Sequence, residues 1–143
     1  IAVRVTVVAT AFVAALLAFG AVSSPRVIAA IPAAVLTGLS FAAPIVAYAA
    51  TLRPGGNFNA VFRFIVTPLF LFSGVFFPVV QLPRVMQWLA SATPLYHGVE
   101  LTRGITLGTL APGAAVVHLL FLMAVTTVGA LAAFRTFAAR LRA

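Results

Sequence analysis

The residues that could do acid–base or metal chemistry are few, and most of them lie in one short segment. Glu100 is the only carboxylate side chain among the 143 residues, and His97 precedes it by three positions. On a helix this spacing places both side chains on one face, where they could relay a proton or hold part of a metal site. A zinc-type site needs three or four ligands, and the only other histidine, His118, lies inside a long apolar run. We therefore expect neither a metal nor a bound cofactor in this chain.

Other catalytic patterns are missing from the sequence. The chain contains no lysine, so it has no glycine-rich phosphate loop ending in Lys, and it has no cysteine for thiol chemistry. Ser91 has no base and carboxylate in a readable arrangement around it. We expect a protein that is not an enzyme and that cannot hydrolyse a nucleotide by itself.

Composition places the chain in a membrane. Hydrophobic residues make up 64% of the sequence and charged residues 7%, whereas soluble domains contain roughly a quarter charged residues. The net charge of +8 comes from arginines scattered singly between apolar runs. This distribution argues against nucleic-acid binding and favours contact with the head groups of a lipid bilayer.

Four apolar runs are candidates for membrane spans. Clusters of turn-forming residues separate them, such as Ser23–Arg26 and Pro54–Asn57. The sequence therefore predicts an all-α membrane protein of a single domain over residues 1–143, with about four transmembrane helices. The predicted spans are residues 4–22, 27–50, 64–80 and 114–135.

Between the third and fourth runs the sequence is half-polar and interrupted by proline. Residues 83–93 and 95–104 each predict a short helix, and Pro94 separates the two. A helix of about ten residues is roughly 15 Å long, which is half the thickness of a bilayer core. Such helices cannot span, so they predict a re-entrant or interfacial pair covered by protein or by a wet cavity.

The arginines predict the orientation, because cytoplasmic loops carry an excess of positive charge. If the C-terminus is cytoplasmic, three arginines lie outside, at positions 26, 84 and 103, and the other six lie inside. The short helix pair then faces outward. The sequence begins at Ile1, inside an apolar run, and we expect that an amino-terminal part of the natural protein precedes it.

Two stretches resemble the signature of the ABC-2 family of transport permeases, most of all its NodJ and daunorubicin-exporter branch. The first stretch is FSGVFFPVVQLP, residues 72–83, and the second is WLASATPLYHGVELTR, residues 88–103. The resemblance is carried by Ser73, Gly74, Phe77, Pro78, Leu82 and Pro83 in the first stretch, and by Pro94, Leu95, His97, Glu100 and Arg103 in the second. Elsewhere the chain agrees with the family in hydropathy only.

The resemblance implies a permease of six spanning helices, of which this chain would supply spans three to six. It implies the membrane subunit of an ATP-binding-cassette exporter in the bacterial inner (plasma) membrane, working as a homo- or heterodimer. A separate nucleotide-binding ATPase subunit would use ATP and Mg²⁺. The substrate, moved outward, would be lipid-like, a glycolipid such as a lipooligosaccharide, or an amphipathic drug-like molecule. The family's first two spans and main coupling helix have no counterpart in these residues.

One group of candidate site residues lies in the outward-facing pair. Tyr96, His97, Glu100 and Arg103 could line or gate the outer end of a substrate path. The simpler interpretation is that Glu100 and Arg103, spaced three residues apart, neutralise each other near lipid, and that Tyr96 anchors the interface.

A second group lies on the predicted cytoplasmic side. Arg53, Phe58 and Arg63 could contact the ATPase subunit, although topology alone would also place these arginines there.

Two other functions stay open at this point. A proton-coupled carrier would use Glu100 and His97 as a relay, although carriers usually place such groups near the membrane midplane. A non-transporting membrane assembly factor would need no such groups. Dependence on an ATPase partner favours the exporter, and dependence on a proton gradient without ATP favours the carrier.

Overall fold

The computed structural model describes residues 1–20, 22, 25–52, 59, 62–76 and 78–141, and this part of the chain is helical with no strand. The all-α class predicted from composition is thereby confirmed. In chain order the elements are α1 (Ala2–Ala18), the 3-10 helix η1 (Pro25–Ala29), α2 (Ala30–Thr51), the π-helix η2 (Phe62–Val66), α4 (Thr67–Phe72), the 3-10 helix η3 (Val79–Gln81), α5 (Arg84–Ser91), α6 (Pro94–Leu107) and α7 (Pro112–Leu141).

Within the described residues, two helical stretches are long and apolar enough to cross a bilayer. One runs through η1 and α2, from Pro25 to Thr51, over 27 residues; the other, Pro112–Ala139, has 28 residues. Only 17% and 11% of their most apolar windows are buried inside the protein. The core helix of a soluble protein would be mostly buried, so these exposed apolar surfaces fit a lipid environment better.

The first and third apolar runs form shorter helices than predicted. α1 has 17 residues, and the third run is helical only from Arg63 to Phe72. The helix of the predicted span 64–80 ends at Phe72, because Gly74 adopts a left-handed backbone with φ +89° and Pro78 is extended. The number of spans therefore stays a prediction.

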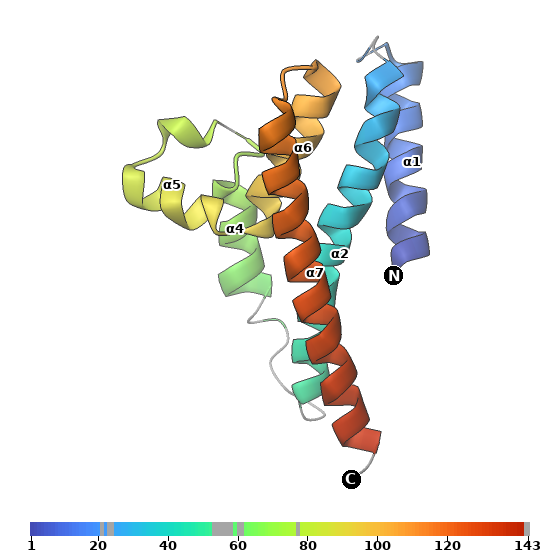
Figure 1. Ribbon diagram of the computed structural model, residues 1–143, viewed down its shortest axis with the longest axis vertical. Helices are drawn as coiled ribbons and strands as arrows, with labels where there is room; N and C mark the ends of the chain where they lie inside the picture. Colours follow the sequence, from blue (N-terminus) through green and yellow to red (C-terminus); the bar gives the residue numbers. More distant parts are fainter. Residues whose placement is uncertain (21, 23–24, 53–58, 60–61, 77, 142–143) are drawn as a thin grey trace.

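The most extensive helix pair is α2 with α7. In Figure 1 the two helices run side by side in the same direction, whereas α1 runs antiparallel to α2. Gly129 of α7 permits the close approach, because a Cβ atom there would lie 2.7 Å from the backbone nitrogen of Pro44 and 2.9 Å from the Cβ of Ala43. Small residues at such a crossing are typical of helix pairs in membranes.

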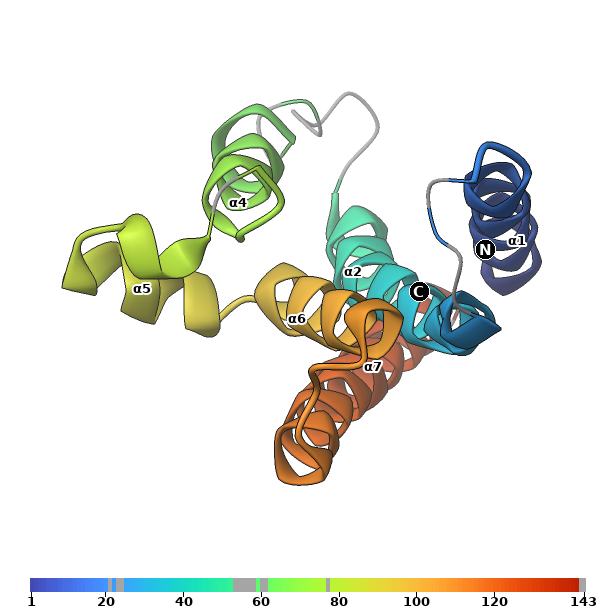
Figure 2. The same ribbon diagram turned by 90° about the horizontal axis from the view of Figure 1, so that it is seen from above.

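The buried core lies where α2, α6 and α7 meet. Its members are Ala33 of α2, Leu101 of α6 and Leu122 of α7, surrounded by the partly buried Leu36, Ile105, Leu110 and Ala115. Gly98 of α6 lies directly on the Thr37 side chain of α2, where a Cβ atom would overlap with it. Figure 2 shows α1 on one side of this centre and α4 with α5 on the other.

The two short helices occupy nearly the predicted ranges. α5 covers Arg84–Ser91 and α6 covers Pro94–Leu107, against the predicted 83–93 and 95–104. Thr93 caps α6, because its hydroxyl accepts a hydrogen bond from the Tyr96 N–H at 3.3 Å, and Pro94 takes the first helical position. Of the two glycines that the sequence offers as an end to this helix, Gly104 and the later Gly108, Gly104 lies inside α6. The helix ends at Gly108, whose φ of +69° makes it the left-handed cap.

Candidate functional site

All four candidate residues of the short helix pair lie on α6, and the structure brings Glu100 and Arg103 together. Arg103 Nη1 lies 3.6 Å from Glu100 Oε1, with both side chains about two-fifths exposed. Pairs with such exposure contribute roughly 0–1 kcal/mol, so this ion pair mainly neutralises two charges. Its stronger contact is with backbone: Arg103 Nη2 donates a hydrogen bond of 2.7 Å to the Gly74 carbonyl oxygen. Arg103 therefore connects α6 to the end of α4, where helix carbonyls lack partners.

His97 connects three helices. Its side chain is buried, its Nε2 lies 2.9 Å from the Ser91 carbonyl oxygen at the end of α5, and its Nδ1 lies 2.8 Å from Nδ1 of His118 on α7. The His97 ring stacks on Phe121 with centroids 3.9 Å apart, and Tyr96 meets it edge to face at 5.4 Å. The His97 side chain therefore connects α6 with both α5 and α7.

The contact between His97 and His118 was not foreseen from the sequence. The two residues are 21 positions apart and lie on different helices. A signal was nevertheless available: a lone ionisable residue inside a spanning run usually faces the protein interior and has a partner there. Within the described residues, no group of three His, Cys, Asp or Glu side chains could hold a metal ion.

Burial sets the protonation of the two α6 rings. Burial lowers the pKa of His97 below its usual value, the hydrogen bond to the Ser91 carbonyl opposes this, and the neighbouring His118 adds to it. Burial also raises the pKa of Tyr96, and the negative charge of Glu100 adds to that shift. Both effects favour uncharged rings at neutral pH, which leaves Glu100 and Arg103 as the charges of the site.

Tyr96 lines a cleft beside α5. The cleft encloses about 530 Å³ between α5, η3 and the start of α6, and its polar lining includes Arg84, Gln87 and Ser91. Gln87 Nε2 donates to the Val80 and Leu82 carbonyl oxygens at 3.2 and 2.8 Å, which holds η3 against α5. Trp88 also lines the cleft and is 77% exposed, as expected of an interfacial anchor.

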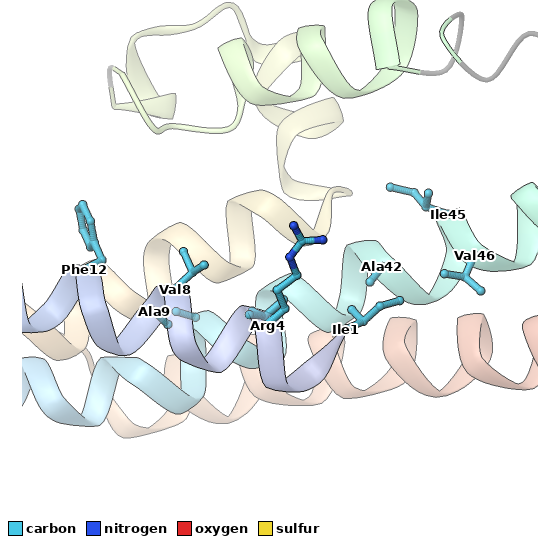
Figure 3. Close-up of a pocket in the computed structure, with 10 residues that line it drawn as sticks. Ile1, Arg4, Val8, Ala9, Phe12, Ala42, Ile45 and Val46 are labelled. Atoms are coloured by element: carbon cyan, nitrogen blue, oxygen red, sulfur yellow. The ribbon is translucent and has the colours of Figure 1, made fainter.

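A groove lined almost entirely by apolar side chains runs along α1. One part, of about 680 Å³, lies between α1 and α2 and has Arg4 as its only charged residue; Figure 3 shows Arg4 beside Val8 and Ile1. A second part, of about 460 Å³, has Arg103 in its wall. The two parts share Ala9, Phe12 and Ala34, so they adjoin along α1, and together we call them the α1 groove. Arg4 lies in the wall of its first part, and Arg103 lies in the wall of its second part.

The predicted ATPase contacts are less fully described. Arg63 lies in η2 with an exposed side chain. Arg53 and Phe58 lie outside the described residues, and the structure therefore does not test their predicted role.

Comparison with known proteins identifies the class. Residues 1–107 match the family described as ABC-2 type transporter. The chain is similar to Nodulation protein J from three bacteria. For Sinorhizobium fredii (strain NBRC 101917 / NGR234) the identity is 38% over 85 residues, 59% of this chain and 32% of that protein. For Rhizobium leguminosarum bv. trifolii the identity is 40% over 80 residues, which are 55% of this chain and 30% of that protein. For Bradyrhizobium diazoefficiens the identity is 35% over 97 residues, which are 67% of this chain and 37% of that protein.

The chain thus spans about a third of the length of these curated relatives. No solved structure matches it. The family match extends over three quarters of the sequence and includes both stretches that carry the resemblance, residues 72–83 and 88–103. The chain therefore belongs to the ABC-2 type transporter family of membrane proteins.

Proposed function

We propose that this chain is part of the membrane subunit of an ATP-binding-cassette exporter. In this proposal a lipid-like, glycolipid or amphipathic drug-like substrate moves outward through the permease. Family membership supports the class of protein. The observation that carries the substrate class is the α1 groove, which offers apolar walls over most of its length and charge only at Arg4 and Arg103.

The α1 groove suits an amphipathic molecule for a physical reason. An acyl or other apolar chain lying along Val8 and Phe12 would meet hydrocarbon, as it does in the bilayer. A polar head group would reach Arg103, whose pairing with Glu100 and with the Gly74 carbonyl leaves further N–H groups for a ligand. The outer end of the groove would then select the head group, and the walls would accept chains of varied shape.

The free energy for transport would come from a partner. The sequence contains no lysine and no phosphate-binding loop, so we assign ATP and Mg²⁺ to a separate nucleotide-binding subunit. That subunit would bind on the cytoplasmic side, where we place Arg53, Phe58, Arg63 and the C-terminus. ATP binding there would shift the permease between states with different affinity for substrate, because only differential affinity can move such an equilibrium. A second permease subunit would complete a dimer.

The first test is purification of the full-length protein from its native membranes in mild detergent. We expect a nucleotide-binding subunit to co-purify in stoichiometric amount, with ATP hydrolysis that vanadate inhibits and that amphipathic substrates stimulate. Arg63→Ala should reduce the amount of bound subunit. Arg84→Ala, which removes an exposed arginine from the outward pair, is the matched control and should leave it unchanged. Absence of any ATPase subunit from the wild-type preparation would contradict the proposal.

A proton-coupled carrier is the second candidate, because the structure places an ionisable pair, His97 and His118, between α6 and α7. Transport into vesicles that follows an imposed proton gradient, without ATP, would favour this candidate. A non-transporting assembly factor would show no flux under either condition.

A further inference from the structure

His97 and His118 are the only histidines of the chain, and the fold brings them together from α6 and α7. We propose that His118 is a positioning residue: together with the Ser91 carbonyl it holds His97 in one tautomer, and the one proton that lies between the two Nδ1 atoms fastens α5 and α6 to the spanning helix α7. We call this contact the histidine clasp. The inference concerns the folded chain and holds whatever molecule the protein transports.

The tautomers follow from the acceptor at the α5 end. A backbone carbonyl oxygen can only accept, so His97 must donate its Nε2–H to Ser91 across the 2.9 Å contact. A neutral imidazole carries one N–H, which leaves Nδ1 of His97 as an acceptor. The 2.8 Å contact between the two Nδ1 atoms then requires His118 to donate its Nδ1–H. His118 is thereby fixed in the tautomer with Nδ1–H, and its Nε2 carries the lone pair.

The same geometry limits how many protons the clasp can hold. One added proton binds Nε2 of His118, and the resulting imidazolium still donates its Nδ1–H to His97. A second added proton would have to bind Nδ1 of His97. Two N–H groups would then point at each other across 2.8 Å, which breaks the contact. The clasp is closed when neutral or singly protonated, and it opens when both rings are charged.

Few titratable groups surround the histidine clasp. Among the described residues, α6 contributes Tyr96, which meets the two rings edge to face at 5.4 and 6.2 Å, and Glu100, which lies three positions after His97 on the same helix. Arg103, the only other charged side chain of α6, is paired with Glu100. The Ser91 carbonyl belongs to α5, and the Phe121 ring that stacks on His97 belongs to α7. The side chain of Thr37 on α2 lies against Gly98, the residue after His97. None of these last three groups titrates.

Nuclear magnetic resonance of the full chain in lipid nanodiscs tests the tautomers directly, because ¹⁵N-labelled histidine gives signals from two residues only. At neutral pH we expect one ring with Nε2–H and the other with Nδ1–H, and a coupling between the two Nδ1 nuclei across the shared proton. His118→Gln should remove the signals of the Nδ1–H ring, which assigns them. Two rings with Nε2–H, the form that imidazole favours in water, would overturn the proposal.

A second measurement uses Trp88, the only tryptophan, which lies on α5 one turn before Ser91. In the wild type we expect its emission to stay constant on mild acidification and to change at a pH well below about 6.5, the value for a free imidazole. His118→Gln keeps an N–H donor but cannot be protonated, so the transition should disappear.

The apolar variant His118→Leu separates positioning from packing. It leaves Nδ1 of His97 without a donor, so Trp88 emission should resemble the acid form already at neutral pH. Leu119→Gln, at the next position of α7, is the control and should behave as the wild type. An unchanged acid transition in His118→Gln would overturn the proposal, and the tautomers of the wild type decide the question if His118→Leu does not fold.

Discussion

The packing of α7 on α2 leads to a sharp prediction at Gly129. A Cβ atom at this position would lie 2.7 Å from the backbone nitrogen and from Cδ of Pro44, whereas ordinary contacts begin near 3.4 Å. Neither Pro44 atom can rotate away, so Gly129→Ala must move the helices apart by about 0.7 Å or strain them. Overpacking of this kind costs about 1–3 kcal/mol. We expect Gly129→Ala to lower the free energy of unfolding accordingly.

The matched control is Gly113→Ala on the same helix, where a Cβ atom would have no heavy atom within 4 Å. Gly113 lies in the first turn of α7 and Gly129 in its interior, where the gain in helix propensity is larger, up to about 1 kcal/mol, so a lower stability of Gly129→Ala gives a minimum value for the clash. Unfolding in mixed micelles with increasing denaturing detergent should separate the two variants by roughly 5- to 150-fold in the folding equilibrium, because 1.4 kcal/mol corresponds to tenfold. Equal stability of the two variants would refute the assignment of Gly129 as the contact point.

Three further predictions follow from other contacts. Arg103→Ala removes the 2.7 Å hydrogen bond to the Gly74 carbonyl, so amide hydrogen exchange around Gly74 should accelerate by about fivefold, for a bond worth about 1 kcal/mol; unchanged exchange would refute the connection. Gly98→Ala should destabilise the fold through its overlap with Thr37, and adding Thr37→Ala should restore part of the loss in the same unfolding assay. Trp88, being 77% exposed, should be quenched most by lipids that carry bromine near the head group. Stronger quenching by lipids brominated near the chain ends would contradict an interfacial position.

Features that depend on local spacing were predictable from the sequence. Glu100 and Arg103 are three residues apart on one helix, and the structure places them 3.6 Å apart. The short helices α5 and α6 were also located, because Pro83 and Pro94 mark their beginnings.

Features that depend on contacts between distant segments were not predictable. Arg103 meets Gly74 across 29 positions, and His97 meets His118 across 21 positions. The third run looked continuous in hydropathy, yet Gly74 interrupts it, whereas Gly104 remains inside α6. Composition cannot distinguish these two glycines, because only the packing around each one decides whether its backbone leaves the helix.

The position of the core has a mechanical consequence. Three helices meet around Leu101 and Leu122, whereas towards the C-terminal end of Figure 1 the described part of the chain narrows to α2 and α7 alone. Pro44 lies in α2 where Gly129 of α7 crosses it, and it leaves one carbonyl of α2 without its helical hydrogen bond. A helix that lacks one hydrogen bond bends most easily at that point. A force applied at the end of α7 would therefore deform the pair of α2 and α7 mainly near the crossing of Pro44 and Gly129. The region around the histidine clasp, where three helices meet, would then rotate as a rigid body instead of deforming.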